Sequence, residues 1–503
     1  PHTPRERTMK QLTGLDATFL YMESATQFGH VSGLSVFARP DDPDYDPLTA
    51  WRGEIERRLH RLEPLRRRVR DVPFRLDHPF WEDDPDFDLE YHVRHTAVAP
   101  PGSDQQLGEL VARIIGRPLD RRRPLWESYV IEGLPEDRFA ILSKIHHATV
   151  DGASGAELLT LMLDSTPEGD AGDDPELGTW TPEPSRGDAA VLASAAMGLA
   201  RKPARAVVLG TRTVRQLGTA TRNPVLVAAA DQLRSNLRGP LGSLLNRGRE
   251  RAPEGEVAGP LPSGMAPPTP FNGTITAHRR FAFRSTPLAS VKAVKNAMGA
   301  TVNDVVMAMC AGGLRHWLED HDALPDKPLV AMIPVSIRTG EEEHRWTNRV
   351  SAIFSGLPTD EPDPLDRVRK VHEAMIGAKG LHDAVPAEEL TDFTQFAPPA
   401  VFARAMRTAL RLTGRMGSPV NLVVSNVPGP REPLYTAGAE LIHYYPVSTI
   451  VDGQGLNITV QSYRDTLDVG LVACRELVPD LWDLCDSIVD ELSVLGKAVG
   501  VDV

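Results

Sequence analysis

The residues best suited to chemistry stand close together, where His146 and His147 are followed by Asp151 and Gly152. The apolar run 139–145 predicts a strand that ends at the histidines. Because adjacent strand residues point to opposite faces, one imidazole can face a cavity while its neighbour turns into the structure. A neutral imidazole can take a proton from a hydroxyl or a thiol, so the pattern favours transfer between nucleophiles.

Other chemistries lack the residues that they need. A metal would require third and fourth ligands beside the histidine pair, and the chain has no H-E-x-x-H pattern. Ser154 is not the nucleophile of a G-x-S-x-G pattern, because Ala156 stands where a glycine is required. The phosphate-binding glycine patterns are also missing. We therefore expect neither a metal nor a bound cofactor, although a histidine pair at a strand end can also be purely structural.

The rest of the chain predicts two α/β domains joined by an insert. Residues 9–163 form the expected N-terminal domain, with strands at 33–39 and 139–145 and a helix at 46–62. Residues 164–188 carry eight acids and one arginine among glycines and prolines, which is typical of a solvated linker. Alternation of strands and helices resumes from Phe271, so we assign 164–270 to the insert and 271–503 to the C-terminal domain.

The insert contains a basic amphipathic stretch. Eleven arginines and lysines stand between residues 189 and 252, against Asp231 and Glu250. In a helix, four arginines fall within about 100° of arc, opposite an apolar face. They are Arg205, Arg212, Arg215 and Arg222. Such a helix can dock on an anionic lipid surface, or it can cross over a domain with its arginines in water.

Composition limits the function classes. The 503 residues carry a net charge of −13, which argues against nucleic acid as a partner. Three cysteines without a C-x-x-C pair favour a reducing compartment, and the first ten residues lack the apolar core of a signal peptide. No stretch approaches the roughly 20 consecutive apolar residues of a membrane span. We therefore expect a cytoplasmic protein.

The histidine motif carries a family resemblance. His146-His-Ala-Thr-Val-Asp-Gly152 resembles the H-H-x-x-x-D-G signature of coenzyme-A-dependent acyltransferases, which include chloramphenicol acetyltransferase and condensation domains. Further segments resemble the bacterial wax ester synthase/diacylglycerol acyltransferase family in order, from Leu15 to about Val472. They are Leu15-Asp-Ala-Thr-Phe-Leu, His30-Val-Ser-Gly-Leu, Arg123-Pro-Leu-Trp-Glu127, Thr301-Val-Asn-Asp-Val-Val306, Pro334-Val-Ser-Ile-Arg338, Ser425-Asn-Val-Pro-Gly-Pro430, Tyr445-Pro-Val-Ser448 and Gly453-Gln-Gly-Leu-Asn-Ile458.

The resemblance implies an α/β fold of two chloramphenicol-acetyltransferase-like domains with an active-site tunnel between them. It makes His147 the general base and His146 its structural neighbour, and it lets Asp151 orient the loop through an ion pair, with Arg338 as the candidate partner. Asn303 is the candidate donor to the oxyanion.

The resemblance also suggests substrate contact for Gly152, Pro124, Leu125 and Trp126, although a buried tryptophan commonly belongs to a core. Residues 301–304 could equally cap a helix, and 425–430 could simply end a strand.

The implied activity is transfer of a fatty acyl group from acyl-CoA to diacylglycerol or a long-chain alcohol, without a covalent acyl-enzyme. Acyl-CoA is then a co-substrate, and the four insert arginines would attach the protein peripherally to a membrane or lipid droplet. Two alternatives stay open: a non-catalytic lipid-binding protein of this fold, and an acyltransferase that takes its acyl group from a carrier protein. The sequence does not rank the acceptors or set the acyl chain length.

Overall fold

The computed structural model describes residues 10–73, 76–150, 161–169, 180–182, 184–185, 187–196, 266–336, 350–383, 408 and 417–503. The chain divides into two compact units, Pro1–Arg186 with Gly259–Val503, and Gly187–Ala258. The larger unit holds the three sheets. The domain boundaries that we predict from the sequence stay a prediction.

The larger unit contains the helices that position the site. They are α1 (Gly14–Met22), α2 (Pro47–Arg58), α3 (Glu63–Arg66), α4 (Leu89–His92), α5 (Asp104–Ile115), α9 (Leu288–Met298), α10 (Val302–Asp320), α11 (Pro364–Asp383) and α14 (Leu481–Val499). The strands are β1 (Lys10–Gln11), β2 (His30–Ala38), β3 (Arg67–Arg70), β4 (Phe80–Asp83), β5 (Val93–Ala97), β6 (Trp126–Glu132), β7 (Arg138–His146), β8 (Arg279–Pro287), β9 (Leu329–Ser336), β10 (Val350–Leu357), β11 (Leu422–Val427), β12 (Tyr435–Thr436), β13 (Ala439–Val447), β14 (Leu456–Tyr463) and β15 (Thr466–Cys474).

The first six-stranded sheet carries the histidines and has the order β12-β13-β2-β7-β6-β5. Its central strand β7 is apolar on both faces: Phe139 and Ile141 pack in one core cluster, whereas Ala140 and Leu142 pack in another. A strand buried on both sides reads as a continuous apolar run, which is why the sequence reveals it. The strands predicted at 33–39 and 139–145 are therefore confirmed as β2 and β7.

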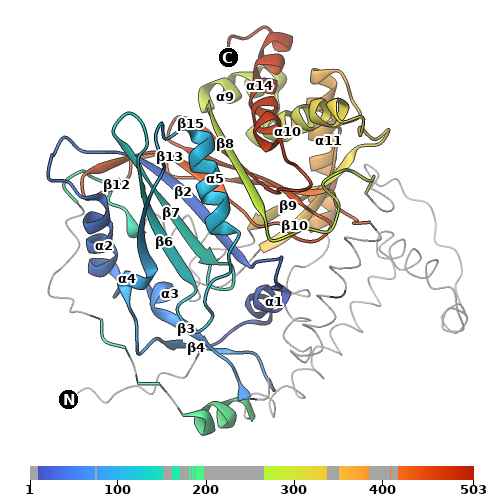
Figure 1. Ribbon diagram of the computed structural model, residues 1–503. Coiled ribbons are helices and arrows are strands. Elements are labelled where there is room, and N and C mark those ends of the chain that lie inside the picture. Colours follow the sequence, from blue (N-terminus) through green and yellow to red (C-terminus); the bar gives the residue numbers. More distant parts are fainter. Residues whose placement is uncertain are drawn as a thin grey trace, which may run out of the picture. The chain divides into compact units, whose positions relative to one another are not determined.

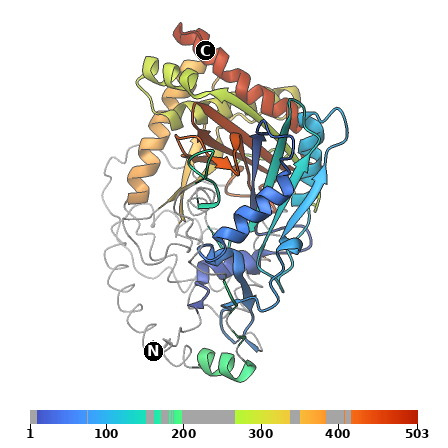
Figure 2. The same ribbon diagram turned by 90° about the vertical axis from the view of Figure 1, so that its left-hand side faces the viewer.

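The second six-stranded sheet has the order β10-β9-β11-β14-β15-β8, and a short three-stranded sheet has the order β1-β4-β3. Helices α9, α10, α11 and α14 gather on one face of the second sheet (Figures 1 and 2). Helix α10 begins with a capping box in which Thr301 accepts from the amide of Asp304 and Asp304 accepts from the amide of Thr301. Its following residues, from Val305 to Leu314, are buried, and the helix packs mainly against α14 and α11.

The two large sheets meet at β13 and β15. A Cβ atom on Gly470 of β15 would lie 1.9 Å from the carbonyl oxygen of Pro446 on β13, so only glycine permits this approach. Asp468 lies two residues before Gly470 in β15. Its fully buried carboxylate accepts from the amide of Tyr444 at 2.8 Å and from the hydroxyl of Ser285 at 2.6 Å. Strands β12 and β13, from the C-terminal half of the chain, thus belong to the sheet of the N-terminal half.

The helix predicted at 46–62 is found as α2, but it ends at Arg58, and residues 63–66 form the separate short helix α3. Among the described helices, none alone is long and apolar enough to cross a membrane; α9 and α10 pass that test only together, bent by 101°.

Candidate active site

His146 is the last residue of β7 and pairs with His30 of β2. Its side chain is 1% exposed, and both ring nitrogens face protein groups. Nδ1 accepts the backbone amide of Ala148 at 3.0 Å, which places the proton of the neutral ring on Nε2. Nε2 in turn lies 3.2 Å from Oε1 of Glu23, at a poor angle for a hydrogen bond, so that contact is mainly electrostatic. His146 is therefore held inside the structure.

Glu23, the residue after α1, joins the histidine strand to two other segments. Its Oε1 accepts the amide of Gly29 at 2.9 Å, and its Oε2 accepts Nη2 of Arg121 at 2.6 Å. Burial alone would raise the pKa of this carboxyl group, but the contact with His146, the charge of Arg121 and the Gly29 amide together lower the pKa to about 2. Glu23 is therefore a carboxylate at neutral pH.

His147 lies in the turn after β7 and is partly exposed. Its backbone amide donates to the carbonyl of Gly29 at 2.8 Å, and the amide of Thr149 donates to the carbonyl of His146 at 2.9 Å. The imidazole stacks on Phe19 of α1, with ring centres 4.1 Å apart and planes 8° from parallel. The inward turn predicted for one imidazole is found at His146, and it stays a prediction that His147 faces a cavity.

The turn depends on a close approach by Gly29. A Cβ atom at this position would lie 2.6 Å from Nε2 of His146 and 3.0 Å from the carbonyl oxygen of Phe19. The glycine lets the segment before β2 pass directly over the buried imidazole. It also presents the carbonyl that holds the His147 amide.

Pro124, Leu125 and Trp126 back the histidine strand. All three are buried, the carbonyl of Leu125 accepts the amide of His146 at 2.9 Å, and the indole of Trp126 donates to the carbonyl of Leu65 at 2.6 Å. These contacts are those of core residues that fix the end of β7. Substrate contact by the three residues stays a prediction.

Asn303 lies in the first turn of α10, one of the helices that cover the second sheet. Nδ2 of Asn426, in β11, donates to Oδ1 of Asn303 at 3.4 Å. The structure thus joins two of the segments that carry the family resemblance, 301–306 and 425–430. The capping roles that we weighed belong to Thr301 and Asp304, whereas Asn303 takes no part in that capping box.

Several predicted residues lie outside the described part of the chain. They are Asp151, Gly152, Arg205, Arg212, Arg215, Arg222 and the candidate partner Arg338. Within the described ranges, no group of three or more histidine, cysteine, aspartate or glutamate side chains is placed to hold a metal ion.

Sequence reasoning missed Glu23, Gly29 and Arg121, which together hold His146. Arg121 lies 98 residues beyond Glu23 in the chain, so no local spacing links them. The family resemblance did point to α1, because its first segment begins at Leu15 and contains Phe19, whose ring stacks on His147.

Two family models match the chain in succession. Residues 12–306 match the wax ester synthase/diacylglycerol acyltransferase catalytic domain, and residues 346–496 match the C-terminal domain of the same family. The chain belongs to the wax ester synthase/diacylglycerol acyltransferase family. Both motifs described above, the histidine pair and Asn303, fall in the catalytic match.

Curated relatives agree with this assignment. A putative diacylglycerol O-acyltransferase of Mycobacterium tuberculosis is 38% identical over 97% of this chain and 100% of its own. Another from the same species is 34% identical over 98% of this chain and 92% of its own. The protein is therefore an acyltransferase, and the non-catalytic alternative is not favoured.

Solved structures give the same fold. The wax ester synthase/diacylglycerol acyltransferase from Marinobacter aquaeolei VT8 superposes with a TM-score of 0.67 at 30% identity, covering 98% of this chain and 100% of that one. The first condensation domain of the calcium-dependent antibiotic synthetase reaches a TM-score of 0.51 at 15% identity, covering 98% and 97%. The mixed α/β fold expected from the sequence is confirmed.

Proposed function

We propose that this acyltransferase moves a fatty acyl group from acyl-CoA to the hydroxyl of diacylglycerol, of a long-chain alcohol, or of both. The products are triacylglycerol and wax ester. The observation that carries the mechanism is the contrast between the two imidazoles: His146 is buried with both nitrogens facing protein groups, whereas His147 is partly exposed.

In this mechanism His147 takes the proton of the acceptor hydroxyl, and the oxygen attacks the thioester carbonyl carbon directly. The tetrahedral intermediate then collapses, the carbon–sulfur bond breaks, and the imidazolium returns the proton to the leaving thiolate. No acyl-enzyme forms. Phe19 supports this cycle, because the face of a stacked aromatic ring stabilises a cation, here the transient imidazolium.

Two further residues take supporting roles. Asn303 is the proposed donor to the oxyanion: its Oδ1 accepts from Asn426, which leaves Nδ2 as the donor end of the amide. Asp151 is proposed to hold the turn after His147, with Gly152 supplying its tight geometry. Both substrates would meet in a tunnel between the two halves.

We further propose that the enzyme works at a lipid surface. Its substrates and products are apolar, and the insert carries the basic face of Arg205, Arg212, Arg215 and Arg222. The protein would then be cytoplasmic and attached peripherally to a membrane or a lipid droplet.

The decisive experiment offers radiolabelled palmitoyl-CoA to the purified enzyme together with diacylglycerol and hexadecanol, and separates the products by chromatography. We expect labelled triacylglycerol, wax ester or both, and intersecting initial-rate lines rather than the parallel lines of a covalent intermediate. His147→Ala should lower the rate by about 10²–10⁴-fold with an unchanged melting temperature.

A matched control is His321→Ala, which removes an imidazole that is 35% exposed and stacks on Trp317 at 4.0 Å in the second half of the chain. This variant should keep wild-type activity. Full activity of His147→Ala would reject the assigned base, and absence of both labelled products with the wild type would reject the proposed reaction.

A further inference from the structure

A pocket of about 440 Å³ lies between the end of α5, the start of β8 and the start of α14. Five arginines and one glutamate line it, together with the indole of Trp482. The arginines are Arg113, Arg117, Arg279, Arg280 and Arg475. We call it the arginine pocket. In a chain with a net charge of −13, this is a pronounced local excess of positive charge.

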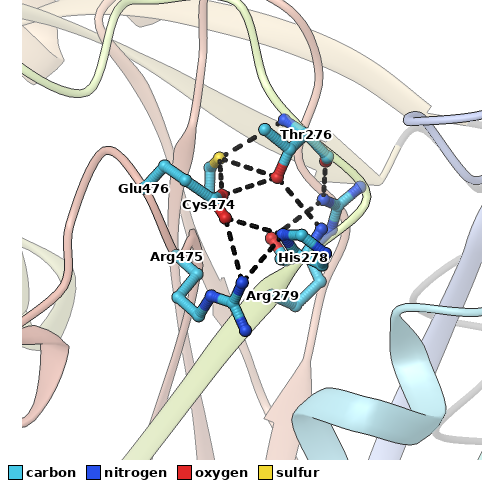
Figure 3. Close-up of polar contacts among 6 residues, drawn as sticks. All are labelled: Thr276, His278, Arg279, Cys474, Arg475 and Glu476. Atoms are coloured by element: carbon cyan, nitrogen blue, oxygen red, sulfur yellow. Dashed lines mark hydrogen bonds and ion pairs between the residues drawn. The ribbon is translucent and has the colours of Figure 1, made fainter.

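Three of these arginines already have partners. Arg113 lies 3.6 Å from Glu109. Arg475 contacts Oε1 of Glu476 at 3.2 Å and Nδ1 of His278 at 2.9 Å (Figure 3). Arg279 donates to the carbonyl of Thr26 at 2.6 Å, and burial lowers its pKa to about 10, so it stays charged at neutral pH.

Arg117 and Arg280 differ from those three. Across the described ranges, neither side chain forms a hydrogen bond or an ion pair, and Nε of Arg280 is buried without a hydrogen-bond partner. A buried donor without a partner costs free energy unless a ligand or water satisfies it. Two guanidinium groups therefore line the pocket without a counter-charge.

The C-terminal end of α5 would normally repel an anion in the arginine pocket, because helix C-termini carry partial negative charge. Buried side chains cover those carbonyls instead. Nζ of Lys144 donates to the carbonyls of Ile114 at 3.3 Å and Arg117 at 2.6 Å, and Nε2 of His30 lies 2.9 Å from the carbonyl of Ile115. Lys144 and His30 thus satisfy carbonyls at this helix end, which reduces the partial negative charge that would oppose an anion in the pocket.

The pocket is also tied to the histidine turn. Arg279 holds the carbonyl of Thr26, and its guanidinium lies 5.2 Å from the ring centre of Phe28. The next residue, Gly29, accepts the amide of His147. The segment 26–29 therefore contacts both an arginine of the pocket and the backbone of the proposed base.

We propose that the arginine pocket binds the phosphate groups of the acyl-CoA donor. This inference rests on the proposed function, because it takes the donor to be a coenzyme A thioester. Arginine is well suited to phosphate through its planar, bidentate donors. Since the pantetheine arm separates the phosphates from the thioester, the phosphates bind away from His147.

The test measures equilibrium binding of coenzyme A to the full-length protein by calorimetry, so it does not depend on turnover. Arg117→Ala, at an exposed position after α5, should weaken binding about tenfold, and Arg117→Glu with Arg280→Glu about a hundredfold. The control Arg369→Glu removes an exposed arginine of α11 and should leave binding unchanged.

Kinetics distinguish this inference from the proposed function. In an active enzyme, the double variant should raise KM for palmitoyl-CoA at least tenfold, but not KM for palmitoyl-N-acetylcysteamine, a thioester without phosphates. If the wild type makes no ester yet binds coenzyme A through these arginines, the proposed function is rejected, but the assignment of the arginine pocket to coenzyme A phosphates is supported.

Two outcomes would overturn the inference. One is equal affinity for coenzyme A in the wild type and in Arg117→Ala, with both proteins folded by melting temperature. The other is unchanged coenzyme A binding in the double variant together with lost binding to phosphatidylglycerol vesicles, which would assign the pocket to lipid headgroups.

Discussion

The carboxylate of Glu23 lies 3.2 Å from Nε2 of the buried His146, on the side of the ring opposite the Ala148 amide. This pair fixes the inner histidine of the motif, and the backbone that follows carries His147 into its partly exposed position. The outer imidazole is thus positioned by its neighbour, which is itself positioned by a residue from α1.

Glu23→Gln should destabilise the protein by about 1–3 kcal/mol at pH 7, because Arg121 and His146 lose their charged partner. The folded pKa of Glu23, about 2, lies below its ordinary value of 4.5, so the stabilisation is fully present above pH 4.5 and is lost as the pH falls toward 2. Urea unfolding of wild type and variant at several pH values measures this difference.

The two unfolding free energies should converge as the pH falls from 4.5 to 2; a constant difference over that range would contradict the account. Glu90→Gln is the control. Glu90 is 83% exposed and lies 3.9 Å from Arg52, so its replacement should change stability by less than about 0.5 kcal/mol.

Gly29→Ala should lower activity strongly and destabilise the fold by about 1–3 kcal/mol, because the new methyl group would lie 2.6 Å from the His146 ring. Ester formation and thermal unfolding check both effects. Gly53→Ala, in α2, is the matched control: no atom lies within 4 Å of its added Cβ, so activity should persist. A fully active Gly29→Ala enzyme would show that the close approach is not needed.

Asn303→Ala should lower kcat by about 10²–10³-fold if Nδ2 donates to the oxyanion. Asn426→Ala should lower it less, and the double variant should match Asn303→Ala alone, because Asn426 acts by orienting Asn303. Steady-state rates of the wild type and the three variants form a double-mutant cycle. Additive losses would speak against orientation.

Thr301→Ala provides the control for the capping role of this segment. It removes the side chain that accepts the Asp304 amide, so it should cost about 1 kcal/mol of stability with little change in kcat. Wild-type kcat in Asn303→Ala would reject Asn303 as the oxyanion donor.

Reversing the charge of Arg205, Arg212, Arg215 and Arg222 should reduce binding to phosphatidylglycerol liposomes at low salt, because electrostatic attraction to anionic lipid would be lost. Co-sedimentation measures the bound fraction. Phosphatidylcholine liposomes and high salt are the controls, and both should abolish the difference between variant and wild type. Equal binding of the two proteins to anionic liposomes would refute the docking role.

Local patterns in the sequence were enough for two strands of the first sheet, β2 and β7, and for the histidine motif. The apolar run of β7 shows itself because both faces of that strand are buried, and the order of short motifs from Leu15 onward identifies the family. Strand geometry predicts that one of the two adjacent histidines turns inward. The structure places this residue, His146, at the end of β7 and His147 in the turn that follows.

Tertiary structure alone decided which groups surround the motif. Glu23, Gly29 and Arg121 reach His146 from segments distant in the chain, and β13 enters the first sheet from the C-terminal half. The arginine pocket likewise draws its cations from α5, β8 and the residue after β15. Such contacts depend on how separate elements pack together. The spacing of hydrophobic residues along one element indicates its secondary structure but does not identify the distant elements that it contacts.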